Sequence, residues 1–572
     1  MRAAPVSPPD DPLARRTRRR LCVRGRDHPP RRRRRRPHRR GPHGRRLSAR
    51  ARARHPFPQR ARPGPHRLSC PRHPRRVAHH PRHAVTEEGP KKPAERPRAR
   101  WRRRLVVVFV LLVVVPTLAH FGVLLGTRIE PPAIAATSGD AAEARPGLRV
   151  LGPAYARKRG AILEVRLAGT PEEIGHQHSR LLYPEMVENE GTLYDQFRHY
   201  VPVPPLRWLL VDLSRLEFRH VDQGMQDERR REIAAQARAF SPDPYDDFLS
   251  TYHRFVFLHS LYDIALSFEH SPLIGCTSFA LGDGAFEDGH TVLARNFDFE
   301  AGSIFDTGKA VFLVREQGRI PYASVAWPGL VGAVSGMNAE GLALVVHGAR
   351  ASDPRPVGEP VVHTTRDLLA RARTTEEAVE LLRDRAPMVS HMIMLTDAKG
   401  DVAIVERAPG HPIHVRRGRG KVPLTNHLEG PLAGDPANRR VEEKTSTRPR
   451  RARLDELLAN LPPGASVERV VGVLRDKKGL GDVELPIGHR RALDALIATH
   501  AVVMDTTARV LWVSEGPHLL GRFVRFDLAR LLGSSYEPRD DEPIVTLPED
   551  PLHRSPAYEA WEKAGMPHHG EL

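Results

Sequence analysis

Cys276 is the residue of this sequence best suited to nucleophilic chemistry. The chain of 572 residues has three cysteines, and two of them, Cys22 and Cys70, lie in a low-complexity leader. Cys276 follows Ile274-Gly275 and precedes the alternating run from Thr277 to Leu281, a pattern typical of the start of a β-strand. A lone thiol there could also be a small buried hydrophobe, since free cysteine is among the most buried residue types.

The sequence after Cys276 predicts a hairpin that carries charged side chains. Asp288-Gly289-His290 is typical of a turn, and Thr291 to Phe299 resumes as a second strand. Arg295 and Asp298 lie on this strand among apolar neighbours, where charges need partners or a chemical role. A structural ion pair between them is disfavoured, because residues three apart on a strand point to opposite faces.

Several short motifs, taken in their order, resemble the cysteine branch of the N-terminal nucleophile hydrolases. The likeness is strongest to the isopenicillin N acyltransferase family, or acyl-coenzyme A:6-aminopenicillanic acid acyltransferase-like family. Acid ceramidase, N-acylethanolamine amidase and choloylglycine hydrolase are more distant relatives. The resemblance spans roughly residues 150 to 530 and rests on GTPEEIG at 169–175, GCTSF at 275–279, Asp288-Gly289, RNFDF at 295–299, GMNAEGL at 336–342 and TNH at 425–427.

The resemblance implies that the chain is a zymogen that cuts itself between Gly275 and Cys276. Cys276 would then carry both a thiol and a free α-amine. Because an α-amine titrates at about 7.7 to 8.0 and a thiol at about 8.5, the amine can accept the thiol proton near neutral pH. Gly275 suits the attack of the thiol on the preceding carbonyl, since it has no Cβ.

The resemblance also implies roles for three further residues. Arg295 would favour the thiolate by its positive charge, and Asp298 would hold the α-ammonium group. Asn426 would donate its amide N–H to the tetrahedral oxyanion, although it could also be a turn residue. An arginine after the strand of Asn426 is usual in the superfamily, and the sequence does not choose among Arg439, Arg448, Arg450 and Arg453.

Two other functions remain open from the sequence. His347 or His427 could pair with Cys276 in a cysteine–histidine dyad peptidase that needs no self-cleavage, although no papain-type signature surrounds Cys276. The chain could also be an inactive, membrane-anchored binding protein on this scaffold. The joint presence of all four candidate site residues argues against an inactive scaffold.

The basic character of the sequence is confined to its first 84 residues. The net charge is +22, and residues 1–84, with 28 Arg, 3 Asp and neither Lys nor Glu, carry +25 of it, which leaves about −3 for the remainder. This leader could be a disordered arm attracted to phosphates. We favour a misplaced start upstream of Val85, since a selected basic arm usually mixes Lys with Arg. No nucleic-acid partner is expected.

Leu105 to Leu125 is nearly continuous apolar sequence and predicts a single transmembrane helix. About 20 residues suffice to span a bilayer, and the basic cluster 96–104 precedes them. By the positive-inside rule the N-terminus is then cytoplasmic and the catalytic part is exported, to the periplasm or the outside. We expect a signal-anchor, with a cleaved signal near Ala133 to Ala136 as the alternative.

The remaining pattern predicts an α+β fold. Blocks of strands separated by pairs of helices favour antiparallel sheets with helices outside, and the resemblance implies a four-layer αββα sandwich, preceded by the transmembrane helix and a disordered basic leader. Strands are expected at 161–167, 310–315, 330–335, 342–347, 391–396, 402–406, 413–416, 422–426, 501–505, 510–514 and 523–526. Helices are expected from Thr170 onward and at 206–218, 227–240, 364–372, 375–384, 451–459 and 467–474. The expected organisation is a leader (1–84), a basic flank (85–104), an anchor (105–125), a linker (126–149), a helical pro-segment that becomes the small chain (150–275), the catalytic domain (276–535) and a tail (536–572).

These observations predict a membrane-anchored, self-processing cysteine hydrolase or acyltransferase. It would act on a linear amide of an acylated small molecule through an acyl-thioester on Cys276 and pass the acyl group to water or an amine. The substrate stays open among an N-acyl amino acid, a fatty amide, a β-lactam side chain and a peptide. No metal or cofactor is expected, and the oligomeric state is left open.

Overall fold

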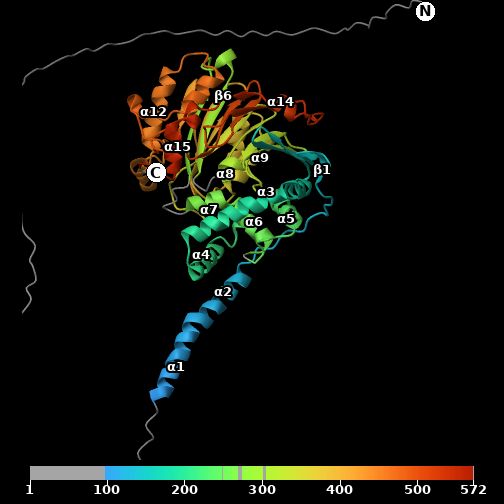
Figure 1. The fold of residues 1–572 in the computed structure, drawn as a ribbon, viewed down its shortest axis with the longest axis vertical. Coiled ribbons are helices and arrows are strands. Elements are labelled where there is room, and N and C mark those ends of the chain that lie inside the picture. The colour runs from blue at the N-terminus through green and yellow to red at the C-terminus, as the bar shows by residue number, and fades with distance from the viewer. Residues whose placement is uncertain (1–96, 248, 268–273, 300–303, 571–572) are drawn as a thin grey trace, which may run out of the picture. The chain divides into compact units, whose positions relative to one another are not determined.

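The computed structural model describes residues 97–247, 249–267, 274–299 and 304–570 (Figure 1). Within them the strands form two sheets. The larger sheet has eleven strands, in the order β1 (Ala142–Arg145), β2 (Leu148–Leu151), β3 (Ala154–Arg159), β4 (Ile162–Gly169), β7 (Ala310–Glu316), β8 (Tyr322–Ala326), β9 (Ser335–Asn338), β10 (Ala343–Gly348), β11 (His391–Thr396), β12 (Val402–Arg407) and β13 (His414–Gly418). The smaller sheet has seven, in the order β14 (Lys421–Leu424), β5 (Ile274–Leu281), β6 (Val292–Phe299), β15 (Ala498–Asp505), β16 (Val510–Ser514), β17 (Phe523–Asp527) and β18 (Thr546–Leu547).

The fold is α+β, with mainly antiparallel sheets and helices packed against both of them. Except for the parallel pair β4 and β7, neighbouring strands in these sheets run antiparallel. The longer helices of the folded part are α3 (Pro171–Tyr200), α4 (Pro204–Glu217), α5 (Asp227–Ala239), α6 (Thr251–His259), α7 (Leu261–Ser267), α9 (Val361–Arg371), α10 (Thr375–Leu382), α11 (Pro436–Lys444), α12 (Thr447–Asn460), α13 (Val467–Leu474) and α15 (Pro556–Lys563). Shorter ones are η2 (Val221–Gly224), η3 (Glu287–Gly289), α8 (Ile304–Thr307), η4 (Leu480–Asp482), α14 (Leu528–Leu531) and η5 (Pro551–Arg554).

Three large hydrophobic clusters lie in succession through the folded part. The first joins one face of the larger sheet to helices that include α3, α5, α6 and α9, and it also holds Cys276. The second joins the two sheets, with Val345 on one side and Leu293 on the other. The third joins the smaller sheet to α12 and α13, through Phe279 and Val470 among others. Figure 1 shows α3 and α12 on different sides of the strands.

Helix α3 begins as its sequence predicts. Thr170 accepts the backbone N–H of Glu173, and the Glu173 carboxylate accepts that of Thr170, which makes a capping box ahead of Pro171. The helix contains one irregular residue, Leu182, two positions before Pro184, because a proline removes a backbone donor and crowds the preceding turn.

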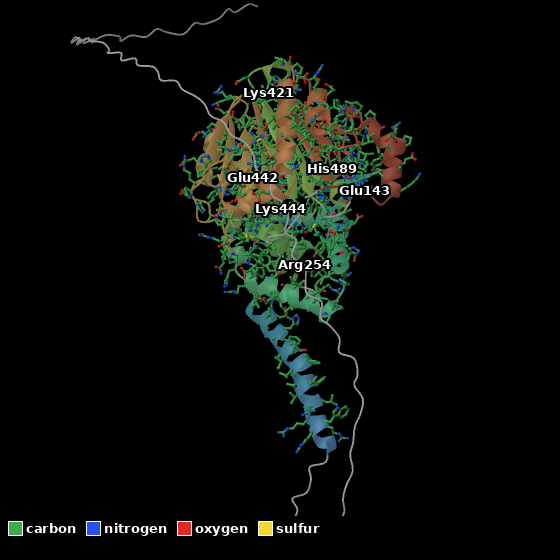
Figure 2. The ribbon with its side chains drawn as sticks, turned by 90° about the vertical axis from the view of Figure 1, so that its left-hand side faces the viewer. Glu143, Arg254, Lys421, Glu442, Lys444 and His489 are labelled. Atoms are coloured by element: carbon green, nitrogen blue, oxygen red, sulfur yellow. The ribbon has the colours of Figure 1, made fainter. Side chains whose placement is uncertain are left out.

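A buried ion pair fixes α6 on α3. Arg254, labelled in Figure 2, pairs with Glu190 of α3 and also with Asp243, 2.7 Å away. All three side chains are nearly inaccessible, so removing one partner would leave an uncompensated buried charge. The pair therefore holds together the two helices that line the cavity described below.

The prediction of a strand at 330–335 is wrong, because these residues form a loop up to the start of β9 at Ser335. The backbone N–H groups of Gly329 and Val331 are bound by His178 and His259 instead of by a neighbouring strand, at 2.8 and 3.0 Å. Pairing resumes only in β9, while β8, which the prediction lacked, lies before this loop. The expected strand 422–426 ends at residue 424, and beyond residue 535 the chain adds β18 and α15.

The apolar segment forms one helix long enough to cross a membrane. It comprises α1 (Pro97–Phe109), a π-helical turn η1 (Val110–Val114) and α2 (Val115–Gly126). Residues 100–126 have a mean hydropathy of 2.6 in their most apolar window, and none of that window is buried. Figure 2 shows its side chains projecting outward along the helix. By length and composition it could be an anchor or a signal sequence.

A buried carboxyl group, Asp263 on α7, makes the stability of the fold pH-dependent. It is fully buried and accepts the backbone N–H of Val361 at 3.0 Å. Burial raises the pKa of Asp263 from 3.8 to about 7. The folded state therefore keeps a proton that the unfolded state has released, so the free energy of unfolding falls as pH rises from about 4 to about 7.

Asp263→Asn is expected to flatten this dependence and to raise the free energy of unfolding above neutral pH by up to about 4 kcal/mol. Urea denaturation at about pH 5 and about pH 8 measures the slope. The exposed Asp384→Asn serves as the matched control and should behave as the parent. An unchanged slope in Asp263→Asn would assign the effect to another buried acid, such as Glu190, whose pKa burial also raises to about 7.

Candidate active site

The hairpin of β5 and β6 places Cys276 and Arg295 on one face of the smaller sheet. In its register Cys276 pairs with Phe297, and Ser278 pairs with Arg295. Because side chains alternate along a strand, these four share a face, and Asp298 lies on the other. The predicted hairpin and the predicted separation of the two charges are thus both found.

Arg295 donates a hydrogen bond to the Cys276 thiol. The Nη2–Sγ distance is 3.2 Å, and the same nitrogen donates to the carbonyl oxygen of Val346 at 2.7 Å. Its other terminal nitrogen donates to Ser335 Oγ at 2.6 Å, and the guanidinium lies over the Phe297 ring, 4.2 Å from its centroid. These contacts fix a fully buried guanidinium against the sulfur.

Burial keeps the thiol protonated in this uncut chain. Cys276 is completely inaccessible, and burial raises the pKa of its thiol above the ordinary value, while Arg295 opposes the rise. A thiol becomes a nucleophile only as the thiolate. The geometry therefore holds the group in place in an unreactive protonation state.

Asn426 contacts the main chain of Cys276. Its Oδ1 accepts the Cys276 backbone N–H at 2.8 Å, and its Nδ2 donates to the carbonyl oxygen of Gly348 at 3.1 Å. Thr447, on α12, binds the backbone N–H of Asn426 at 2.8 Å. The side chain expected to serve the oxyanion thus lies at the cysteine, with its amide donor engaged by Gly348.

Arg450 is the arginine that reaches this site. It donates to the carbonyl oxygen of Cys276, to Thr277 Oγ1 at 2.8 Å and to Asn426 Oδ1 at 2.9 Å, and it is almost completely buried. Of the other three candidates, Arg448 pairs with Glu442, Arg453 pairs with Asp476, and Arg439 lines a separate open pocket. Arg450 lies about one turn inside α12, but Arg448 and Arg453 lie on the same helix, so a helix start at Ser446-Thr447 does not by itself select Arg450.

Asp298 lies beside the bond that precedes Cys276. It is paired with Gly275 across the hairpin and is 4% exposed. A Cβ on Gly275 would lie 3.3 Å from the nearest carboxylate oxygen of Asp298, so the glycine permits this close approach. The charge of Asp298 also opposes the fall in the Arg450 pKa that burial causes.

The hydrogen bonds of the two candidate histidines go elsewhere in the described part of the chain. His347 Nε2 lies 2.6 Å from Ser278 Oγ, and burial lowers the pKa of His347 well below its ordinary value. His427 Nδ1 lies 3.0 Å from Thr447 Oγ1. This geometry gives no support to a dyad with Cys276.

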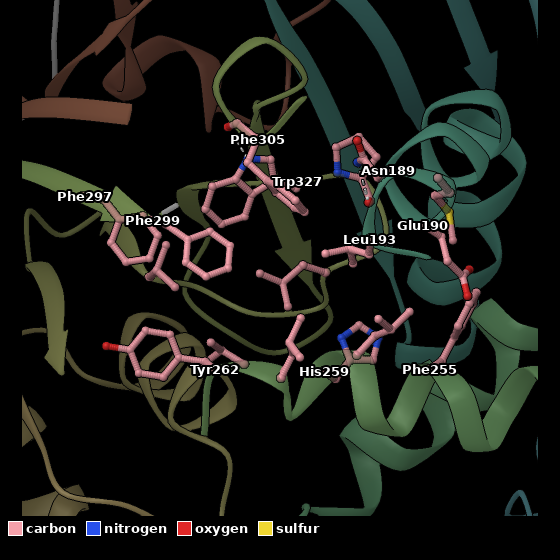
Figure 3. A pocket seen from close by; sticks show the side chains of 18 residues that line it. Asn189, Glu190, Leu193, Phe255, His259, Tyr262, Phe297, Phe299, Phe305 and Trp327 are labelled. Atoms are coloured by element: carbon pink, nitrogen blue, oxygen red, sulfur yellow. Dashed lines mark hydrogen bonds between the residues drawn. The ribbon is translucent and has the colours of Figure 1, made fainter. Parts of the chain in front are cut away.

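An apolar cavity of about 110 Å³ opens on the thiol side of β6. Phe297, the partner of Cys276, lines it, and so does Val334, whose carbonyl oxygen accepts a hydrogen bond from Arg295. Figure 3 shows rings from several elements around it. The aromatic lining residues are Phe255, Tyr262, Phe297, Phe299, Phe305 and Trp327.

A second cavity, of about 90 Å³, lies on the main-chain side of Cys276. Gly275, the residue before the cysteine, lines this cavity, together with several arginines. Its polar lining includes Asp298, Arg350, Asn426, Arg450 and Arg490, together with the backbone of Gly275 and Gly348. The apolar cavity is thus lined by Phe297, the cross-strand partner of Cys276, and the arginine-rich cavity by Gly275, the residue before it.

Comparisons with known proteins point to one family. Residues 285–490 match the family model described as acyl-coenzyme A:6-aminopenicillanic acid acyl-transferase, a stretch that holds Arg295, Asp298, Asn426 and Arg450 and begins after Cys276. An uncharacterized protein of Archaeoglobus fulgidus is 26% identical over 253 residues, which is 41% of this chain and 41% of that relative's own length.

Solved structures are similar at low identity. The Caenorhabditis elegans ortholog of N-acylethanolamine-hydrolyzing acid amidase is 17% identical, covers 41% of this chain and 93% of its own, and has a TM-score of 0.30. Penicillin V acylase from Agrobacterium tumefaciens is 20% identical, with 46% and 94% covered and a TM-score of 0.29. The family match confirms, over residues 285–490, the resemblance to the acyl-coenzyme A:6-aminopenicillanic acid acyl-transferase family that the motifs predicted.

Proposed function

We propose that this protein is a self-processing cysteine amidase or acyltransferase of the N-terminal nucleophile type. The observation that carries the proposal is the convergence on Cys276: Arg295 at its sulfur, Asn426 at its backbone nitrogen and Arg450 at its carbonyl oxygen. The succession of helix, sheet, sheet and helix across the three hydrophobic clusters supports the four-layer αββα arrangement that this class uses.

Processing would begin with the thiol of Cys276. The sulfur attacks the carbonyl carbon of Gly275, the C–N bond breaks, and the thiol proton passes to the released nitrogen, which becomes the α-amine. Water then hydrolyses the thioester and restores the thiol. Asn426 holds the N–H of the scissile Gly275–Cys276 peptide, and Arg450 holds the carbonyl of the next peptide, so the backbone of Cys276 is fixed on both sides of its Cα during the attack.

Catalysis on the substrate would repeat this chemistry. The α-amine accepts the thiol proton, and the thiolate attacks the amide carbon. Arg295 stabilises the thiolate, and Asp298 holds the α-ammonium group. Asn426 donates to the tetrahedral oxyanion once processing frees its amide from Gly348. The leaving amine takes the proton from the α-ammonium, and water or a second amine resolves the acyl-thioester.

The two cavities favour one of the candidate substrate classes. An acyl chain would occupy the aromatic cavity that Phe297 lines, and the amine part would occupy the arginine-lined cavity. Because guanidinium groups bind carboxylates well, an N-acyl amino acid fits both cavities better than a neutral fatty amide. The apolar helix would anchor the enzyme with its catalytic part exported.

Purified protein is expected to release free amino acids from N-acyl amino acids at least ten-fold faster than ethanolamine from matched N-acylethanolamines. Mass spectrometry of the released amine measures both rates. Hydroxylamine should trap the acyl group as a hydroxamate, and Cys276→Ala should form none. Equal rates on both amides would overturn the substrate class, and release by Cys276→Ala would overturn the mechanism.

A further inference from the structure

Helix α4 presents an uncovered apolar face. Five of its leucines are exposed by 37 to 53%: Leu206, Leu209, Leu210, Leu213 and Leu216. Val203 and Tyr200, just before it, are 52% and 75% exposed. Single exposed leucines are ordinary on a protein surface, but a contiguous apolar patch marks an interaction site.

The polar residues of α4 face the apolar helix 100–126. His120 of α2 is 2.8 Å from the carboxylate of Asp212, and its ring meets Trp208 edge-on at 5.0 Å between centroids. Arg215 donates to Thr127 Oγ1 at 3.0 Å and to the carbonyl oxygen of Leu124 at 2.9 Å. The two helices are therefore joined by a specific polar seam, which leaves the leucines of α4 facing outward.

This seam fixes the depth of α4 relative to a membrane span. At about 1.5 Å per residue, His120 lies roughly 9 Å before the end of the span at Gly126. Amphipathic helices at a bilayer surface bury their apolar face by roughly 5 to 10 Å. A polar side chain within a span also needs a partner, and Asp212 supplies one for His120.

We propose that α4 is an interfacial membrane helix that lies in the bilayer surface next to the span. Its uncovered leucines continue the exposed apolar surface of residues 100–126, so one lipid phase would cover both. Two exposed basic residues flank α4, Arg198 in the last turn of α3 and Arg219 just after α4, where they would meet lipid phosphates. The occupant of this face is thus phospholipid, in the leaflet where the span leaves the membrane.

An α4 seated in lipid also brings the aromatic cavity close to the bilayer. The backbone N–H of Ile129, just beyond the span, donates to His253 of α6, and Phe255 and Leu258 of the same helix line the cavity. Long-chain substrates would then enter from the membrane, a step that rests on the proposed function.

Spin labels on the full chain test the position of α4. A cysteine-free parent (Cys22→Ser, Cys70→Ser, Cys276→Ala) receives one cysteine at Leu209 or Leu213, or at Leu480, which is 56% exposed on η4 and serves as the control. The proteins are reconstituted in vesicles of phosphatidylcholine with a minority of phosphatidylglycerol. Circular dichroism melting must match the parent.

Labels at 209 and 213 are expected to collide several-fold more with oxygen, which partitions into lipid, than with a water-soluble nickel chelate. The label at 480 should show the reverse. Nickel access at 209 and 213 equal to that at 480 would overturn the proposal. Strong dipolar broadening between labels of two chains would also overturn it, because a second copy would then cover the face.

Delivery of long-chain substrates from the membrane to the aromatic cavity is tested separately, by measuring activity. Leu209→Glu with Leu213→Glu should lower the rate on a long-chain substrate in vesicles at least five-fold and leave the rate on a short-chain soluble analogue unchanged. Leu480→Glu is the matched control and should change neither rate. Both substitutions are made in the wild-type chain, which keeps Cys276. Equal rates in the wild type and both variants would overturn delivery, and inactivity of the wild type would overturn the proposed function without changing the label result.

Discussion

Cys276→Ala is expected to leave one uncut chain with no amidase activity. The wild-type chain should separate into two, the larger beginning at Cys276. The reason is that Cys276 is fully buried yet fixed from three directions, by Arg295 at the sulfur and by Asn426 and Arg450 at the peptide. Such fixation suits an attack on the preceding carbonyl, and alanine lacks the attacking atom.

Intact-mass measurement and N-terminal sequencing of both proteins check this prediction. Cys276→Ser should be cut slowly, because a hydroxyl keeps the attack but is a weaker nucleophile than a thiol. The double variant Cys22→Ser with Cys70→Ser, at cysteines outside the described residues, is the control and should be cut as the wild type. A wild-type chain that stays whole while it hydrolyses amides would refute the N-terminal nucleophile mechanism.

Local patterns predicted the elements around the thiol well. The alternation from Thr277 to Leu281 and from Thr291 to Phe299 gave the hairpin of β5 and β6, because both strands bury one face on the other sheet and the other face on helices. The same kind of pattern gave a wrong prediction for the loop before Ser335. Its apolar residues are typical of a strand, yet the side chains of His178 and His259, far away in the chain, bind its backbone.

The position of a site residue could be predicted from the sequence where the residue lies on a regular strand. It could not be predicted where contacts between distant segments bring the side chain to the site. Alternation within β6 correctly placed Arg295 and Asp298 on opposite faces of the strand, while their roles were implied by the family resemblance. Arg450 could not be placed in this way, because four nearby arginines have similar sequence surroundings, and only the packing of α12 on β14 and β5 brings one of them to Cys276. The sequence also could not predict that Asn426 accepts a hydrogen bond from Cys276, since an amide side chain can donate or accept.

Asn426→Asp separates the two functions of this amide. The aspartate keeps an oxygen that can accept the Cys276 N–H and pair with Arg450, so the chain should fold and the cut should still occur. It lacks the N–H that the proposed mechanism directs to the oxyanion and places negative charge there. We expect kcat on amide substrates to fall by about 10²- to 10³-fold, the usual effect of losing one oxyanion donor.

The matched control for Asn426→Asp is Asn438→Asp on α11, which makes the same change at a fully buried amide that binds the backbone of Leu428 and Ala433 instead. It should lower the free energy of unfolding without a comparable fall in kcat of the cut enzyme. Steady-state kinetics and urea denaturation of both variants separate the two effects.

If Asn426→Asp is cut and keeps wild-type kcat, Asn426 positions the cysteine only and another group must donate to the oxyanion. If it stays uncut while Asn426→Gln is processed, the amide is needed for cleavage itself, because a carboxylate beside the thiol also opposes the thiolate that must form there.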